Sequence, residues 1–175
     1  MQSLIQSEVH KTLDMTKLKH LLPHYCKVVR YDDVLKATSL KQIMGNKTVL
    51  VMLFNVHDKK HRLLNQPGHF FCISTKSKSD GVVVFSSTGM SPDHEIFLTQ
   101  SDPKLLSRIL PKNYKYNDVA LQKSDSSNTC WRWIIVFAHL AQIGLKAFQD
   151  MFKSPAMHLS SPDQVVTMLT YILLA

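Results

Sequence analysis

The stretch that decides the fold reads SDSSNTCWRWIIVFAHL and covers Ser124 to Leu140. A polar run typical of a helix cap ends at Thr129, and a mostly apolar helical run follows Cys130. We therefore expect Cys130 in the first turn of a helix, where backbone N–H groups lack helical partners and the helix dipole favours negative charge. A thiolate gains from both, so the position favours a cysteine nucleophile. The alternative is a buried cysteine that packs as a small apolar side chain.

The composition predicts one globular domain over residues 1–175. The chain is 45% apolar and 19% charged, and it is long enough for a good core. No apolar run reaches the roughly 18 residues that a membrane span needs, and no glycine-rich phosphate loop occurs. Cys26, Cys72 and Cys130 are widely spaced, which indicates reduced thiols in a reducing compartment. Without a CxxC or CxxH spacing, we expect no metal site.

The net charge of +8 favours an acidic partner, such as nucleic acid, an anionic surface or an acidic protein substrate. The basic residues are scattered, with small groups at residues 59–62 and 76–78. Scattered charge is more typical of a solvated surface than of a binding stripe. Nucleic-acid binding through the basic surface is therefore the weaker interpretation.

Hydrophobic periodicity predicts an α+β domain with a mainly antiparallel central sheet flanked by helices. The expected strands are short apolar or alternating runs at residues 26–31, 47–55, 69–75, 82–86 and 117–122. The expected helices begin at capping residues or end at Pro or Gly, at residues 4–22, 32–44, 101–111, 130–144, 145–153 and 161–174. The first and last of them, within residues 1–22 and 161–174, flank the domain. A turn is expected at residues 87–92.

A cysteine nucleophile needs a base and oxyanion donors, and residues upstream of Cys130 could supply them. His69 begins a strand directly after Gly68, at a rim where a side chain can face a cleft. Gln122 ends the strand before the cysteine loop, and its amide N–H₂ group could face the oxygen of an acyl intermediate. The backbone N–H of Cys130 is the second candidate donor.

These residues stand in an order that resembles one family. Gly68 to Phe71 (GHFF), then Val84 to Pro92 (VFSSTGMSP), then Gln122 and Cys130 resemble motifs of the adenovirus-protease and Ulp1-like group of cysteine peptidases. That group reads Gly-His-Trp on a strand and Phe-Asp-Ser-x-Gly or Phe-Glu-Pro-x-Gly in a turn. Gln, a short polar loop and Cys-Gly at a helix start then follow. The resemblance covers about residues 47–145.

The resemblance implies a cysteine-protease-like fold with its nucleophile at a helix N-terminus. It implies that Cys130 is the nucleophile, His69 the general base and later acid, and Gln122 the oxyanion donor. It also implies hydrolysis of an amide or isopeptide bond without a cofactor. The expected substrate-binding residues border these motifs and are Gly68, Asn128, Trp131 and Trp133. For the two tryptophans, packing in the core is the alternative, and it is the more usual one for such residues.

Two positions depart from the family pattern. Ser86 stands where the acid that orients the histidine is expected, and a hydroxyl brings no charge. Either Ser86 is a weaker orienting group in a Cys-His dyad, or the protein is inactive, or another residue replaces the acid; the candidates are Ser87, Asp80 and Asp93. Trp131 replaces the glycine that usually follows the cysteine, and its ring could narrow the cleft.

The combined pattern predicts a viral cysteine protease that processes a polyprotein, in the host cell cytoplasm or the virion. The small size and the two departures are more typical of divergent viral members than of cellular ones. One alternative is an isopeptidase that removes ubiquitin or a ubiquitin-like modifier, as a deubiquitinase or deSUMOylase does. Another is a non-catalytic basic module that binds nucleic acid or a partner protein, which Ser86 and Trp131 favour.

Overall fold

Within the described residues, five strands form one sheet in the order β1-β2-β3-β4-β5. The computed structural model describes Leu13 and residues 15–60, 62–64, 68–123, 128–153 and 161–174. The strands are β1 (Cys26–Arg30), β2 (Val49–Phe54), β3 (His69–Ser74), β4 (Val83–Phe85) and β5 (Lys115–Tyr116).

The sheet is mixed, whereas the sequence predicted a mainly antiparallel one. β3 pairs antiparallel with both β2 and β4, but β1–β2 and β4–β5 are parallel pairs. Parallel neighbours need crossover connections that are longer than a hairpin turn. The helical segments between β1 and β2 and between β4 and β5 provide these crossovers.

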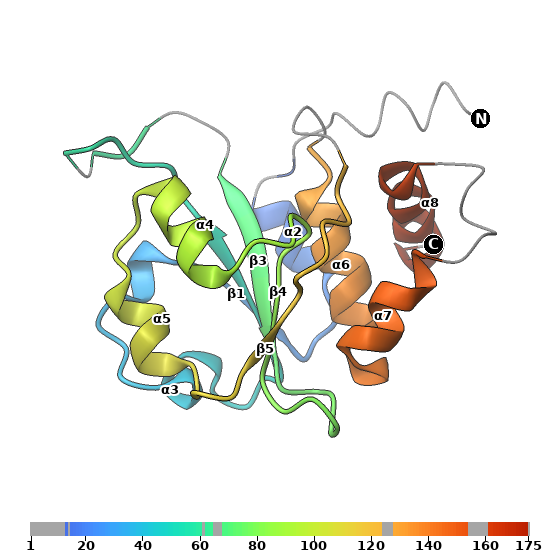
Figure 1. Cartoon of the computed structure of the whole chain (residues 1–175), viewed down its shortest axis with the longest axis horizontal. Helices are drawn as coiled ribbons and strands as arrows, with labels where there is room; N and C mark the ends of the chain where they lie inside the picture. Colours follow the sequence, from blue (N-terminus) through green and yellow to red (C-terminus); the bar gives the residue numbers. More distant parts are fainter. Residues whose placement is uncertain are drawn as a thin grey trace.

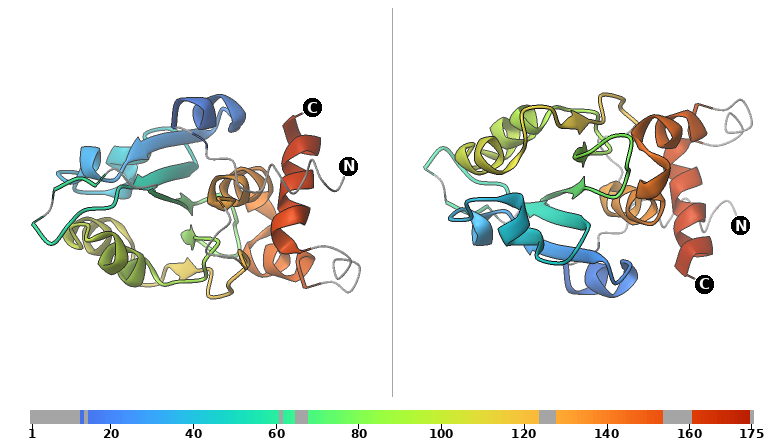
Figure 2. Two further views of the ribbon diagram at one scale, coloured as in Figure 1. Left: turned by 90° about the horizontal axis from the view of Figure 1, so that it is seen from above. Right: turned by 90° about the horizontal axis from the view of Figure 1, so that it is seen from below.

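Helices cover both faces of the sheet, as Figures 1 and 2 show. Buried side chains of α3 (Leu40–Met44), α4 (Pro92–Thr99) and α5 (Lys104–Ile109) form one core with one face. Buried side chains of α2 (Met15–Leu21), α6 (Cys130–Leu140), α7 (Leu145–Met151) and α8 (Pro162–Leu174) form a second core with the other face. The structure is therefore α+β, as the sequence predicted.

Alternate residues of the central strands serve the two cores. In β2, Val49 and Val51 pack with α6, whereas Leu50 and Met52 pack on the side of α4 and α5. Coverage of both faces explains why β2 is an almost continuous apolar run. β3 divides in the same way, and its first residue is His69. The start of α6 and α4 lie near the end of the sheet where β3 begins (Figure 1).

Two element predictions are wrong, and one helix was not predicted. The single helix expected at residues 32–44 is a 3₁₀ turn, η1 (Asp32–Val34), followed by the short α3, because Ser39 caps a new helix start through the N–H of Gln42. The turn expected at residues 87–92 is present at residues 87–88, and α4 follows it from Pro92 without having been predicted. The last strand is Lys115–Tyr116 rather than residues 117–122. The backbone N–H of Asn117 still donates to Val84 O, but the Asn117 side-chain amide donates to Ser86 O and Val119 O, so the ladder does not continue along β4.

The other predicted elements are confirmed within a few residues. α6 begins at Cys130, as expected, and ends at Leu140, after which η2 (Ala141–Ile143) leads into α7. Of the helix predicted at residues 4–22, the structure describes α2, and residues 4–12 lie outside the described residues. None of the helices in the described part of the chain is long and apolar enough to cross a membrane.

Candidate active site

The first turn of α6 packs against the start of β3 and brings the Cys130 thiol into hydrogen-bond contact with the His69 ring. The two residues lie 61 positions apart in sequence (130 − 69), so only the fold joins them. Cys130 remains partly exposed at the helix N-terminus. The pairing of thiol and imidazole that the sequence predicted is therefore present as a contact.

The surroundings of Cys130 favour its thiolate. Burial alone would raise the pKa of the Cys130 thiol, but the hydrogen bond and charge of His69 act in the opposite direction. Hydrogen bonds from the backbone of Phe70 and Trp131 add to this effect. Together they hold the pKa of Cys130 below its ordinary value. A helix start that points N–H groups at sulfur is a known way to produce a reactive cysteine.

The Nε2 atom of His69 lies close to two oxygen atoms. It lies 2.9 Å from Ser86 Oγ and 3.4 Å from Glu95 Oε1. Nδ1 is then the ring nitrogen that remains for the Cys130 thiol. Burial lowers the pKa of His69, but the hydrogen bond to Cys130 and the charges of Glu95 and Cys130 outweigh it, and the pKa is raised. The site therefore favours imidazolium beside thiolate.

Glu95 supplies the carboxylate that position 86 lacks. Its side chain is 6% exposed, and its Oε1 atom accepts hydrogen bonds of 2.6 Å from both Ser86 Oγ and Thr88 Oγ1. Ser86 thus lies between the histidine and a buried carboxylate, so its hydroxyl connects His69 to a negative charge. The orienting group is a hydroxyl–carboxylate pair rather than Ser86 alone.

None of the three candidate replacements for the acid contacts His69 in the structure. Asp80 accepts from Lys115 Nζ at 2.7 Å and from the Leu145 N–H at 2.8 Å, while Asp93 is exposed. Ser87 donates to Gln122. Glu95 was missed because α4 was not predicted. The signal was present, since Ser91-Pro92-Asp93 repeats the Ser-Pro-Asp pattern that correctly located the start of α8.

Gln122 is attached to the segment that carries Ser86. Its Oε1 accepts a 2.8 Å hydrogen bond from Ser87 Oγ, and its backbone N–H donates to Ser87 O at 2.9 Å. These bonds fix the orientation of the amide, because the carbonyl end is directed toward Ser87. Gln122 is half-buried, as expected for a side chain at the edge of a site.

The predicted substrate-binding role of the two tryptophans does not fit the structure. Trp133 is fully buried, packs on Phe152 with ring centroids 4.6 Å apart, and donates from Nε1 to Asp163 Oδ1 at 3.0 Å. Trp131 is 6% exposed, and the Arg132 guanidinium stacks over its ring, with Cζ 4.1 Å from the ring centroid. Both follow Cys130 within the apolar helix, so the core takes them and they cannot form a rim.

Position 68 requires glycine for a structural reason that the sequence alone did not show. A Cβ atom at this position would collide with the Phe54 carbonyl and lie 2.9 Å from Leu53 Cδ1. Glycine therefore permits the start of β3 to approach β2 closely, which positions His69. Of the other predicted substrate-binding residues, Asn128 is half-buried two residues before Cys130.

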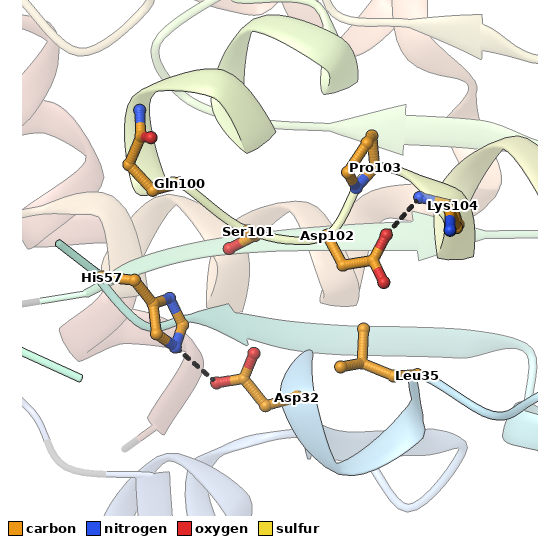
Figure 3. A pocket seen from close by; sticks show the side chains of 8 residues that line it. All are labelled: Asp32, Leu35, His57, Gln100, Ser101, Asp102, Pro103 and Lys104. Atoms are coloured by element: carbon orange, nitrogen blue, oxygen red, sulfur yellow. Dashed lines mark hydrogen bonds and ion pairs between the residues drawn. The ribbon is translucent and has the colours of Figure 1, made fainter. Parts of the chain in front are cut away.

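A cavity of about 560 Å³ lies elsewhere, between the residues after β1 and β2 and the segment that joins α4 to α5 (Figure 3). In it, His57 Nε2 lies 3.4 Å from Asp32 Oδ2. Neither Cys130 nor His69 lines this cavity. It is therefore not the place where the thiol would react.

Within the described ranges, no three His, Cys, Asp or Glu side chains gather closely enough to hold a metal ion. The chemistry on offer is that of a thiol, an imidazole, a carboxylate and an amide. No protein-family model and no curated protein matches the chain. The case for a function consequently depends on the geometry of these four groups.

Proposed function

We propose that this chain is a cysteine peptidase, of the viral polyprotein-processing kind, in which Cys130 is the nucleophile. The observation that carries the proposal is the contact between the Cys130 thiol and His69 at the start of α6. It lowers the pKa of Cys130, whereas burial raises the pKa of Cys26 to about 12 and that of Cys72 well above its ordinary value. Of the three thiols, Cys130 is thus the one prepared for nucleophilic attack.

The reaction follows from the protons that the site holds. The Cys130 thiolate attacks the carbonyl carbon of a peptide bond, and the carbonyl electron pair moves to oxygen. The His69 imidazolium gives its proton to the leaving amine, and the C–N bond breaks to leave a thioester. His69 then takes a proton from water, whose oxygen attacks the thioester, and the thiolate leaves. The acid is released and the starting state returns.

Oxyanion donors and an orienting carboxylate assist in this scheme. The Gln122 amide and the Cys130 N–H would donate to the oxyanion that forms at the carbonyl oxygen. Glu95, through Ser86 and across 3.4 Å directly, would stabilise the imidazolium and keep the ring in the tautomer that presents Nδ1 to sulfur. The resemblance of the motifs and their order supports these roles, and the observed contacts are compatible with each.

The test is hydrolysis with a matched pair of variants. Purified protein is incubated with a peptide library derived from whole-proteome digests, and new peptide termini are identified by mass spectrometry. Wild type and Cys72→Ala should produce the same set of cleavages, and Cys130→Ala none. Cleavages that persist in Cys130→Ala would contradict the proposal.

Two electrophilic probes separate the substrate classes. Intact mass is measured after exposure to a peptide vinyl sulfone and to a ubiquitin vinyl sulfone. An adduct on Cys130 with the peptide probe alone supports the peptidase. An adduct with the ubiquitin probe alone would replace it by the isopeptidase. If Cys130 reacts with both probes no faster than Cys26 does, the non-catalytic binding module would be favoured.

A further inference from the structure

Asp163 is a buried carboxylate that has no part in the proposed reaction as described so far. It lies in the first turn of α8 and is 4% exposed. Oδ1 accepts hydrogen bonds from Thr129 Oγ1 at 2.5 Å and from Trp133 Nε1 at 3.0 Å. Oδ2 accepts from the backbone N–H of Lys123 at 3.2 Å. A residue near the C-terminal end of the chain thus contacts the segment around the nucleophile at three points.

The three donors occupy informative positions. Lys123 directly follows Gln122, and Thr129 directly precedes Cys130. The Asp163 carboxylate therefore connects the residue beside the amide donor with the residue beside the nucleophile. Charged acceptors form stronger hydrogen bonds than neutral ones, so the connection is a firm one.

The contact with Thr129 also changes how α6 begins. Thr129 is the N-cap residue, and a threonine there ordinarily accepts a hydrogen bond from an N–H in the first turn. Here its hydroxyl makes no capping bond and donates to Asp163 instead. The Trp131 N–H, one of the donors that such a cap would take, is directed at the Cys130 sulfur. Asp163 therefore holds the Thr129 hydroxyl in a contact other than the usual cap.

We propose that Asp163 is a positioning residue that holds the Gln122 amide and the N–H groups at the start of α6 in register around the oxyanion. This inference rests on the proposed function. It makes α8 a working part of the site rather than a helix that only covers the core. It predicts that loss of the carboxylate impairs reactions that pass through an oxyanion and spares reactions of the thiolate that do not.

Two reactions of Cys130 separate these effects. Iodoacetamide alkylates the thiolate by displacement of iodide at a saturated carbon, and no oxyanion forms. In acylation by p-nitrophenyl acetate, the thiolate attacks the ester carbonyl, an oxyanion forms, and p-nitrophenolate leaves as the acetyl group remains on sulfur. The ratio of acylation rate to alkylation rate, followed by absorbance and by intact mass, reports the oxyanion donors. Cys26→Ser/Cys72→Ala background variants ensure that only Cys130 contributes.

Asp163→Asn keeps the size of the side chain and removes its charge. We expect the ratio to fall about 10- to 100-fold, since loss of a single oxyanion donor costs about 100-fold or more. The alkylation rate, measured on its high-pH plateau where Cys130 is fully thiolate, should stay within about twofold of the parent. Gln122→Ala should lower the ratio in the same way, and the double variant should lose less than the product of the two. Should Asp163→Asn fail to fold by circular dichroism, Thr129→Val breaks the same link and should give the same result.

Thr170→Val is the matched control. Thr170 lies on the same helix, is 1% exposed, and its hydroxyl donates within α8 to Val166 O at 2.7 Å. This variant should leave the ratio unchanged. A ratio unaltered in Asp163→Asn, or lowered equally in Thr170→Val, would overturn the Asp163 inference alone. Wild type that is alkylated but never acylated at Cys130 would overturn the proposed function, and the inference with it.

Discussion

Cys72 and Cys130 are both largely buried, but their thiol pKa values are shifted in opposite directions. Cys72 is only three residues from His69 along β3, whereas Cys130 contacts the His69 ring from α6. The Cys72 side chain is fully buried among apolar residues of the core that includes Val51 and Phe85. Burial raises the pKa of its thiol well above the ordinary value. Cys130 is also removed from water in large part, yet its pKa is lowered.

The difference between the two thiols is what compensates for lost water. Burial disfavours a thiolate at both positions. At Cys130 the imidazolium of His69 and backbone donors from Phe70 and Trp131 replace the lost hydration, whereas Cys72 packs in an apolar core and burial dominates its pKa. Cys26 confirms the rule, because nearby Lys76 and Lys47 lower its pKa too little to offset burial. Proximity to a histidine in sequence is irrelevant; contact decides.

The largest effect expected is that of Cys130→Ala. Removal of the nucleophile should reduce peptide hydrolysis at least about 1,000-fold, because covalent catalysis has no substitute in the site. Cys72→Ala should retain activity within a few-fold, at a cost to the free energy of unfolding of about 1 kcal/mol for the small cavity. Hydrolysis by peptide turnover and stability by urea unfolding check the two. Equal loss of activity in both variants would remove the distinction between the thiols.

Glu95→Gln should have the next largest effect, a fall in kcat of about 10- to 100-fold. Loss of a charge that orients a catalytic histidine costs about 10,000-fold where the carboxylate bonds the ring directly, and here Ser86 lies between the two groups. The charge of Glu95 raises the pKa of His69, so its removal should lower that pKa. The pH at which the His69 ring titrates, followed by NMR, should move downward. An unchanged titration would show that Glu95 does not act on the ring.

Ser86→Ala should have the smallest effect of the series. It removes the hydroxyl between His69 Nε2 and Glu95 but leaves their direct 3.4 Å approach and the bond from Thr88 to Glu95. One hydrogen bond is worth about 1 kcal/mol, which corresponds to a fall in kcat of about 2- to 10-fold. A loss as large as that of Glu95→Gln would mean that the hydroxyl, not the carboxylate, is the essential group. Steady-state kinetics on both variants decides.

The local sequence pattern was sufficient to predict several of the strands and helices of this molecule. The apolar run of β2, the position of His69 at the start of β3 and the start of α6 at Cys130 follow from side-chain period and capping, and the structure has them. The mixed pairing of the sheet did not follow, because pairing direction depends on which connections cross the sheet. β5 has only two residues, both exposed, so no hydrophobic period marks it.

The parts of the candidate site that sequence did not reveal are those that arrive from distant elements. Glu95 reaches His69 from α4, and Asp163 reaches Thr129 from α8 across 34 positions. The local sequence marks each of them only as a residue in the first turn of a helix, and it does not show that the carboxylate is buried. Trp133 illustrates the converse: a residue near the nucleophile in sequence is on the buried face of α6. Spacing along the chain locates the nucleophile, but only packing identifies its supporting groups.

The measurement that tests the account most directly is the rate of iodoacetamide reaction at Cys130 against pH, in wild type and in His69→Ala. An ordinary thiol titrates at about 8.5. Because His69 lowers the pKa of Cys130, the wild-type rate should reach its plateau at a distinctly lower pH. In His69→Ala burial acts with less opposition, so the profile should move upward and the rate at pH 7 should fall at least about 10-fold. Identical profiles in the two proteins would contradict the thiolate–imidazolium pair, and with it the proposed peptidase.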